Sequence, residues 1–212
     1  MKTLFIDTSS NYLDVAIIID ETVYEKRIES VNEHSKHSIT AIEALFKENN
    51  IKPREIDAIM VMNGPGSFTG LRIGVTIAKV YAWSFNIKVI PISTLKAYAL
   101  SCLNYDYYVS VIDARRDYVY AGIYDSKYNS LLEDQHISKE KLYNIIKKYN
   151  NCFLVGNTNI KNIKTNEIKL NIKKIYNYYK DKEGVNPHSL IPNYLKKVEA
   201  EEKLEEKNDK RI

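Results

Sequence analysis

Short β-rich apolar runs fill the first thirty residues of the chain, and apolar positions at helical spacing follow them. The β-rich runs are separated by turn-prone residues and predict an antiparallel meander of three strands, at 2–6, 13–19 and 22–28. A helix is predicted next, over 38–48, because four apolar residues there fall on one face: Ile39, Ile42, Leu45 and Phe46.

The pattern then alternates between strands and helices, with a strand at 58–62, a helix at 71–85 and a strand at 88–92. The resulting order, βββαβαβ with short connections, favours an α/β sheet.

The second half repeats this order more weakly after a break at 104–106. It contains two strands joined by a tight connection, then a helix and a last strand, at 107–112, 118–124, 139–148 and 152–155. Two halves of similar order predict a duplicated architecture. We therefore predict an N-terminal lobe of residues 1–104, a smaller and more divergent C-terminal lobe of residues 105–195, and a charged tail of residues 196–212, a solvated helix or a frayed end.

Composition places the chain among ordinary globular proteins, since 44% of its 212 residues are hydrophobic and 27% are charged. No apolar run approaches the roughly 20 residues of a membrane span, and the start runs directly into a strand, so we expect a cytoplasmic protein. Cys102 and Cys152 lie in no CxxC or Cys/His cluster and are predicted to be buried apolar residues. The net charge of +4 is scattered, and the lysines and tyrosines of 161–179 are interpreted as compositional bias, so no strong nucleic-acid surface is predicted.

A glycine-rich turn lies between the strand at 58–62 and the helix at 71–85, where a phosphate loop would lie. Glycine accepts positive φ and lets the backbone approach a ligand closely, and Ser67 or Thr69 can cap the helix. The amides at such a helix start form an anion site. The turn lacks the GK[ST] ending of a P-loop, so phosphate binding is one interpretation among others.

Two other turns carry polar groups. Asp7 and Ser9 end the first strand, where they either help to hold a metal and phosphates or form a turn in which Asp7 accepts backbone amides. The connection 113–117 carries two arginines, which either bind a phosphate or carboxylate or face water.

His34 and His37 are three residues apart and would bind a metal if they met on one helical face. The sequence offers no third ligand at a metallohydrolase spacing, so we predict no metal site and interpret His37 and Ser38 as a helix start.

The helix at 71–85 is apolar on more than one face, so one sheet does not bury it easily. Gly70 and Gly74 form a small-residue patch that would let another helix approach closely. The helix is therefore buried on every side or pairs with a partner.

Five motifs together are similar to the bacterial TsaB (YeaZ) family, and the similarity extends from the first strand to about Lys197. The eleven-residue glycine motif is the most specific of the five. The motifs are Asp7-Thr8-Ser9, His37-Ser38, Gly64-Pro65-Gly66-Ser67-Phe68-Thr69-Gly70-Leu71-Arg72-Ile73-Gly74, Asp113-Ala114-Arg115 and Pro192-Asn193-Tyr194-Leu195-Lys196.

The resemblance implies an actin-like (ASKHA) fold of two ribonuclease-H-like lobes and a role in making threonylcarbamoyladenosine (t6A) beside the tRNA anticodon. In that pathway a separate enzyme makes threonylcarbamoyl-adenylate, and TsaD transfers the group with a metal held by an HxxxH motif. TsaB is the non-catalytic partner of TsaD, and the ATPase TsaE joins the pair. The chain has HxxH at His34 and His37 in place of HxxxH, which agrees with lost metal chemistry. Its 113–115 segment lacks the glycine of the DxG signature, so it departs from the second phosphate loop of actin-like ATP binding.

The resemblance also implies pairing through the first two helices, either as a homodimer or with TsaD, with tRNA bound indirectly and ATP or ADP at the partner interface. The interface set that we predict is Ile42, Leu45, Phe46, Gly70, Leu71, Ile73, Gly74, Ile77 and Tyr81. The phosphate- or nucleotide-facing set is Asp7, Ser9, Gly64, Gly66, Ser67 and Thr69. The alternatives are an actin-like ATPase or small-molecule kinase that uses this second set, and a metallopeptidase-like hydrolase built on the two histidines.

Overall fold

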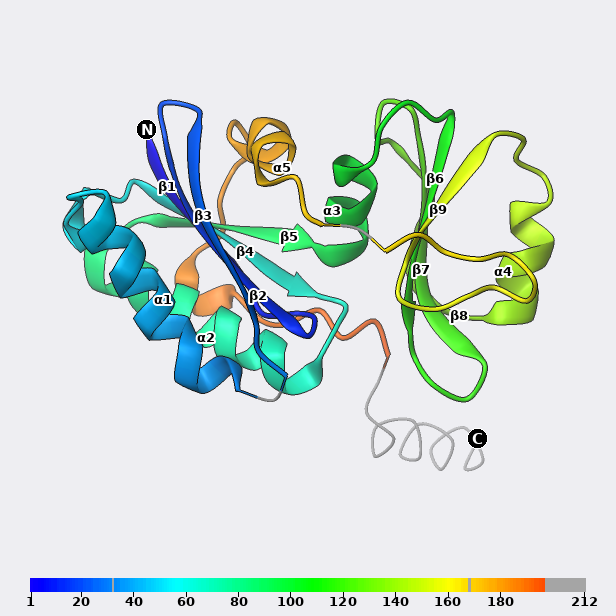
Figure 1. Ribbon diagram of the computed structural model, residues 1–212, viewed down its shortest axis with the longest axis horizontal. Coiled ribbons are helices and arrows are strands. Elements are labelled where there is room, and N and C mark those ends of the chain that lie inside the picture. Colours follow the sequence, from blue (N-terminus) through cyan, green and yellow to red (C-terminus); the bar gives the residue numbers. More distant parts are fainter. Residues whose placement is uncertain (32, 168, 197–212) are drawn as a thin grey trace, which may run out of the picture.

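The computed structural model describes residues 1–31, 33–167 and 169–196, and Figure 1 shows two sheets side by side. The predicted tail therefore lies outside the described residues, except for its first residue. No helix in the described part of the chain is long and apolar enough to cross a membrane.

The first sheet has five strands in the order β3-β2-β1-β4-β5. The first three form the predicted antiparallel meander, and β4 and β5 add to β1 in parallel. The strands are β1 (Lys2–Asp7), β2 (Tyr12–Ile19), β3 (Thr22–Glu29), β4 (Ala58–Gly64) and β5 (Lys88–Ser93). The α/β sheet predicted from the pattern is confirmed.

Helices cover both faces of this sheet. Successive residues of a strand point to opposite faces, and in this sheet both sets are apolar and must be buried. Leu4 and Ile6 of β1 pack against α1 (His34–Glu48) and α2 (Phe68–Phe85), whereas Phe5 packs against helices on the other face. Both helices begin earlier than predicted. In particular, α2 begins at Phe68 because the hydroxyl of Ser67 accepts the Gly70 N–H at 3.2 Å, which confirms Ser67 as its cap.

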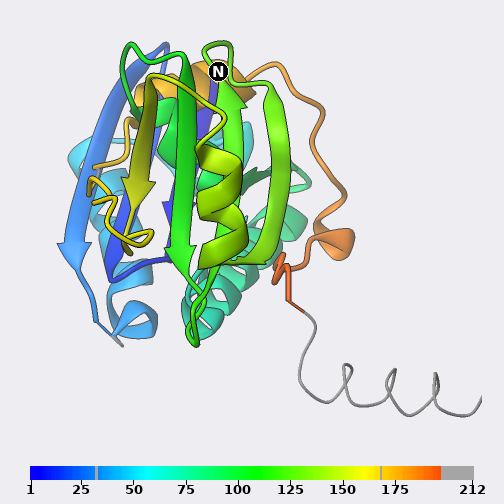
Figure 2. The same cartoon turned by 90° about the vertical axis from the view of Figure 1, so that its right-hand side faces the viewer.

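The second sheet has four strands in the order β8-β7-β6-β9, and α4 (Lys139–Ile146) covers its outer face (Figure 2). The strands are β6 (Tyr107–Asp113), β7 (Tyr118–Asp125), β8 (Ser130–Ser138) and β9 (Cys152–Gly156). The sequence pattern predicted all of these strands except β8.

The helix α3 (Thr94–Ser101), also missed, lies between the two sheets (Figure 1). Leu95 and Ala99 belong to the apolar cluster of the second sheet, and Ala97 and Leu100 belong to a cluster of the first. One short helix therefore serves as a common layer for both sheets.

The chain returns to the first sheet after β9. The helix α5 (Ile172–Tyr179) packs on it beside α3, and the ion pairs Lys169–Glu25 (2.7 Å) and Lys180–Glu21 (2.8 Å) hold its flanks to the β2–β3 hairpin. The predicted domain boundary near residue 104 stays a prediction. The helix α5 follows that position in the sequence but packs on the first sheet, which precedes it.

A final extended segment, residues 184–195, crosses the edge of the first sheet, and we call it the strap. It includes the short 3₁₀ helix Pro187–Ser189, while the other one, Pro53–Glu55, precedes β4. The strap pairs with β5 through Val185 and with the end of β4 through Asn193, whose N–H donates to the Asn63 carbonyl at 2.6 Å.

Candidate functional site

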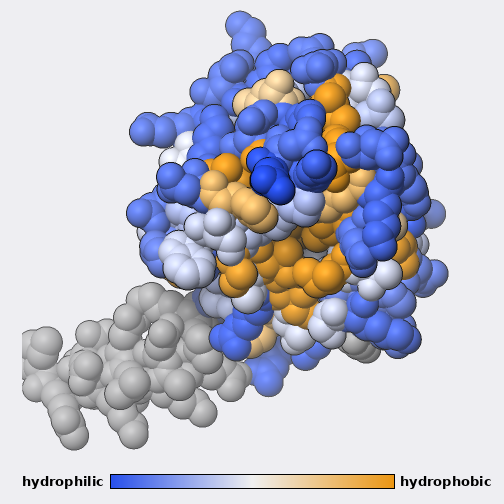
Figure 3. All heavy atoms as spheres, turned by 90° about the vertical axis from the view of Figure 1, so that its left-hand side faces the viewer, coloured by the Kyte–Doolittle hydropathy of each residue, from blue (hydrophilic) through white to orange (hydrophobic). Residues whose placement is uncertain are grey.

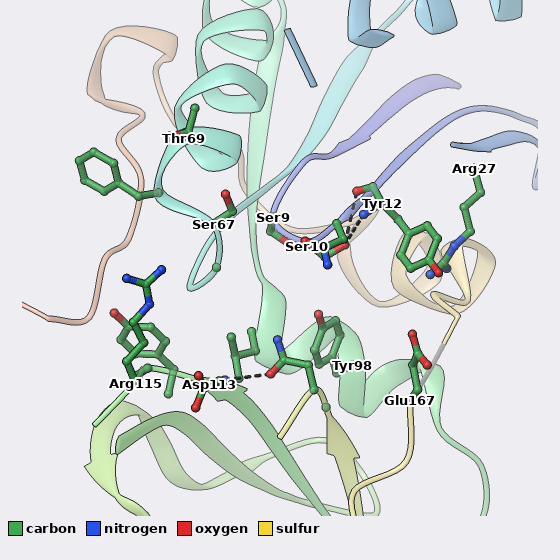
Figure 4. Close-up of a pocket in the computed structure, with 18 residues that line it drawn as sticks. Ser9, Ser10, Tyr12, Arg27, Ser67, Thr69, Tyr98, Asp113, Arg115 and Glu167 are labelled. Atoms are coloured by element: carbon green, nitrogen blue, oxygen red, sulfur yellow. Dashed lines mark hydrogen bonds between the residues drawn. The ribbon is translucent and has the colours of Figure 1, made fainter. Parts of the chain in front are cut away.

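A cleft of about 640 Å³ opens between the two lobes (Figure 4). Ser67 and Thr69, at the start of α2, lie on one side of it, and Asp113 and Arg115 lie opposite. Arg27 and Tyr12 close one end. Other lining residues include Ser9, Ser10, Gly66, Tyr98, Tyr120, Asn157 and Glu167.

The glycine loop is held by its own chain on two sides. A Cβ at Gly64 would lie 2.2 Å from the Asn193 carbonyl oxygen of the strap, and one at Gly66 would lie 2.5 Å from the Ser9 carbonyl oxygen. The same Ser9 carbonyl accepts the Ser67 N–H at 2.7 Å. Gly66 therefore lines the cleft, whereas Gly64 faces the strap.

The start of α2 points into the cleft. The helix has eighteen residues, so its N-terminal amides present partial positive charge to whatever enters. Ser67 and Thr69 are both exposed there, as a phosphate-facing position requires. Phosphate binding at these residues stays a prediction.

Asp7 is buried beneath the cleft. Its Oδ1 accepts the Ser9 N–H at 2.7 Å, which is the geometry of the turn-capping alternative. Burial raises the pKa of this carboxyl, and the side chain and backbone N–H of Ser9 offset only part of that effect.

A second buried carboxylate, Asp14, lies opposite Asp7 in the β1–β2 ladder and was missed by the sequence analysis. Burial, and then the nearby charge of Asp7, raise the pKa of Asp14 to about 7. Arg27 Nη1 lies 3.7 Å from Asp14 Oδ2 and opposes the shift, while the guanidinium stacks 4.0 Å from the Tyr12 ring centroid. A single carboxylate in the apolar run of β2 was the signal available in the sequence.

The two histidines do not converge. His34 is buried, with Nε2 2.8 Å from the Ser10 carbonyl, whereas His37 Nε2 lies 3.2 Å from Glu33 Oε2 on the outside of α1. The helix begins at His34, so the predicted start at His37 and Ser38 is wrong. Among the described residues no group of three His, Cys, Asp or Glu side chains could hold a metal ion.

The connection 113–117 is the predicted tight turn between β6 and β7. Arg115, Arg116 and Asp117 all have positive φ, at 63°, 50° and 62°. Left-handed backbone costs a non-glycine residue roughly 1–2 kcal/mol, so the turn holds Arg115 toward the cleft at an energetic cost. The Asn157 side chain accepts the Asp113 N–H at 2.8 Å and fixes the base of the turn.

Several residues of the predicted interface set lie in the core. Ile42, Leu45, Phe46 and Leu71 are at most 7% exposed, so they pack within the subunit. The predicted approach of a partner helix at the glycines is also wrong. A Cβ at Gly70 would lie 1.9 Å from the Thr8 carbonyl oxygen, and one at Gly74 would lie 2.4 Å from Thr8 Oγ1, so the close neighbour is Thr8, directly after the chain's own β1.

The outer face of α2 is apolar and exposed. Ile73, Ile77 and Tyr81 are half-buried, and Val80 and Trp83 are 56% and 64% exposed. The predicted excess of apolar surface on this helix is therefore confirmed. Further exposed apolar side chains are Ile39, Phe68, Phe85 and Ile191. Figure 3 shows apolar residues gathered on the side of the molecule where α1 lies in Figure 1, bordered by hydrophilic ones.

The late Pro-Asn-Tyr motif and the glycine motif form one structural unit. Arg72 Nε donates to the Tyr194 hydroxyl at 2.9 Å, and its guanidinium lies 3.9 Å from the Phe68 ring centroid. The Phe68 and Tyr194 rings are 4.9 Å apart. The strap thereby fixes the first turn of α2 at the mouth of the cleft.

Comparisons with known proteins agree with this geometry. The family model of TsaD, tRNA N6-adenosine threonylcarbamoyltransferase, matches residues 22–180. A Bacillus subtilis protein named "tRNA threonylcarbamoyladenosine biosynthesis protein TsaB" is 32% identical, covering 96% of this chain and 97% of that protein. The Escherichia coli protein of the same name is 30% identical over 62% of this chain and 58% of that protein.

A crystal structure from Pseudomonas aeruginosa, of a protein described as similar to peptidase YEAZ, superposes with a TM-score of 0.75. The superposition covers 92% of this chain and 99% of the Pseudomonas aeruginosa chain, and the two sequences are 19% identical. At this identity the likeness shows the shared two-lobed α/β fold.

Proposed function

The chain belongs to the TsaB family and takes part in tRNA threonylcarbamoyladenosine biosynthesis, and we propose that its role there is that of a non-catalytic partner of TsaD. In this role it docks on TsaD and supports transfer of the threonylcarbamoyl group to the adenosine beside the anticodon. TsaE joins the pair, tRNA is bound through TsaD, and the reaction takes place in the cytoplasm.

The observation that carries the proposal is the apolar outer face of α2. Val80 and Trp83 are more than half exposed on a helix whose inner side is fully packed. Exposed apolar patches on soluble proteins mark interaction surfaces, and tryptophan is enriched among the residues that dominate binding energy. We define the docking face as Ile73, Ile77, Val80, Tyr81 and Trp83, and we add Ile39, which is exposed on the neighbouring helix α1. A second copy of the chain would compete with TsaD for this face, and ATP or ADP would lie at its border.

Contacts within the chain around the glycine loop support a non-catalytic role. The Asp7 carboxylate caps its own turn, the Gly64 surface is filled by the strap, and the Ser67 amide is bonded to Ser9. Three groups that would approach phosphates are thus engaged by the chain itself.

Binding to purified TsaD tests the docking face. We expect Trp83→Asp to weaken the complex at least 30-fold, about the loss expected at a strong interface residue, as measured by calorimetry or sedimentation. Leu131→Asp is the matched control, because Leu131 is 44% exposed on β8 of the other lobe. Equal affinities for the two variants would remove the docking face from the proposal.

Reconstitution tests the non-catalytic role. The chain alone should neither turn over ATP nor modify tRNA, and modification with threonylcarbamoyl-adenylate should require TsaD and this chain together. Modification of tRNA by the chain without TsaD would contradict the proposal.

One observation favours a second candidate, an actin-like ATPase or small-molecule kinase. The cleft brings Ser9, Thr69 and Arg115 from both lobes around a space large enough for a nucleotide. Mg²⁺-dependent ATP binding by calorimetry, lost in Arg115→Ala, would promote this candidate. The metallopeptidase alternative gains no such support, because His34 and His37 contact different groups.

A further inference from the structure

One carboxylate connects the two lobes. Asp134 lies on β8 of the second sheet, and its Oδ2 accepts a hydrogen bond from Ser93 Oγ, at the end of β5 of the first sheet. Its Oδ1 accepts a hydrogen bond from the hydroxyl of Tyr124, which is 1% exposed. We call these three residues the interlobe lock.

Irregular pairing between β7 and β8 directs the Asp134 side chain toward the first lobe. The β7–β8 ladder shifts register between Ala121 and Ile123, and again between Ile123 and Tyr124. Such bulges turn a side chain away from its regular direction. Gly122 lies in the bulge, and a Cβ there would come within 2.5 Å of both Asp134 Oδ1 and the Tyr124 hydroxyl. Glycine at this position leaves the space that the lock occupies.

A second tie lies in the same corner. Lys96 of α3 donates from Nζ to the Tyr128 carbonyl at 2.6 Å, and the same ammonium lies 4.2 Å from the Tyr124 ring centroid. The Tyr128 ring stacks on Tyr108 with centroids 5.3 Å apart. The β7–β8 turn is therefore held to the helix that both sheets share.

Apolar contacts complete the junction. Leu95 and Ala99 of α3 pack in one cluster with Ile112 of β6, and Leu195 of the strap packs against that cluster. Leu100, on the other side of α3, packs against the first sheet. The junction thus combines a packed helix, two polar ties and the strap. Domains that close on ligands instead move about a few hinge residues that absorb large backbone changes.

We propose that the interlobe lock holds the two sheets at one fixed angle, so that the cleft keeps its width with or without a ligand or partner. The chain is then a rigid platform, and an anion that enters the cleft stays open to solvent. This inference rests on the junction alone and is independent of the proposed docking on TsaD.

Distances between spin labels on the two lobes test the lock. Labels at Thr40→Cys on α1 and Lys141→Cys on α4, both exposed positions, would be placed in a background with Cys152→Ser, since Cys102 is buried. We expect one narrow distance distribution that neither Mg²⁺-ATP nor TsaD changes. Asp134→Ala should broaden the distribution at least twofold.

Three further variants keep the result interpretable. Glu133→Ala, an exposed neighbour on the same strand, should match the unmodified chain. Asp134→Asn should also match it, because the amide can still bond both hydroxyls. Ser93→Ala removes the hydrogen bond to Asp134 together with the cap that the Ser93 hydroxyl provides to the Lys96 N–H at the start of α3, and it should broaden the distribution less than Asp134→Ala. A broad or ligand-shifted distribution in the unmodified chain would overturn the proposal, as would a folded Asp134→Ala protein with the original narrow distribution.

Discussion

The two sides of α2 have opposite surroundings. On the inner side, Gly70 and Gly74 bring the helix onto Thr8 so closely that a Cβ does not fit. On the outer side, Val80 and Trp83 remain more than half exposed. A stripe of small residues therefore shows that something approaches closely, but it does not show whether that neighbour is a partner or the chain itself.

The largest expected effect comes from filling the inner side. Gly74→Leu would place a side chain where Thr8 Oγ1 already lies 2.4 Å from the Cβ position. We expect a loss of about 3 kcal/mol or more in the free energy of unfolding, measured by urea denaturation, because neither the helix nor β1 can shift easily. Thr76→Leu, on the exposed side of the same helix, should change stability by less than about 0.5 kcal/mol. A stable Gly74→Leu protein that loses only its partner would restore the predicted helix approach.

The buried carboxyl of Asp14, opposite Asp7 in the β1–β2 ladder, predicts that the stability of the chain depends on pH. Asp14 has a pKa of about 7 in the folded chain and an ordinary value of 3.8. Between pH 5 and 7 the folded state therefore binds one proton that the unfolded state has released. This group makes the unfolding free energy fall by about 1.4 kcal/mol for each pH unit of increase, and its contribution is flat well above pH 7.

Asp14→Asn should remove this slope. The difference in unfolding free energy between the variant and the unmodified chain should change by about 2 kcal/mol from pH 5 to 7 and little above pH 8. Urea titrations at a series of pH values measure it. A difference that is constant over pH 5–8 would contradict the assignment.

The strap side of α2 should show a smaller effect. Tyr194→Ala removes the ring contact with Phe68 and the hydrogen bond from Arg72, and we expect a loss of about 1–2 kcal/mol. Tyr194→Phe keeps the ring and should lose about 0.5–1 kcal/mol. If both variants were as stable as the unmodified chain, the strap would not hold the first turn of α2.

The smallest effect on stability is expected at the outer face. Trp83→Ala should change the free energy of unfolding by less than about 0.5–1 kcal/mol, since most of the ring is exposed. Thermal unfolding of the isolated chain measures this. A loss of several kcal/mol would mean that Trp83 supports the fold through its neighbours, including His188, and is a poor probe of docking.

The meander and the glycine turn could be predicted because period-two patterning and Gly-Pro signals are local. The helix α5 was missed although Ile172, Ile175 and Tyr179 recur at helical spacing, because the surrounding Lys, Asn and Tyr obscured the pattern. Eight-residue α3 gave a weak signal for a different reason, namely that it is apolar toward both sheets.

The candidate site was predicted in part, since Ser9, Gly66, Ser67 and Thr69 all line the cleft. Arg27 of the cleft and the buried Asp14 next to it could not be placed near Asp7 from local pattern. They come together only through the register of β2, which sets Asp14 opposite Asp7 on one side and Arg27 on the other. The predicted interface set contained core residues because helical periodicity identifies an apolar face without saying what covers it.

The return of α5 to the first sheet has a consequence for synthesis of the protein on the ribosome. Phe5, Met60 and Ile90 face the layer that α5 completes, so they stay accessible until residues 172–179 have left the exit tunnel. The earliest part of the chain is thus among the last to be fully covered. A chain that ended near residue 104 would leave this face of the first sheet without α5, and so without a finished domain.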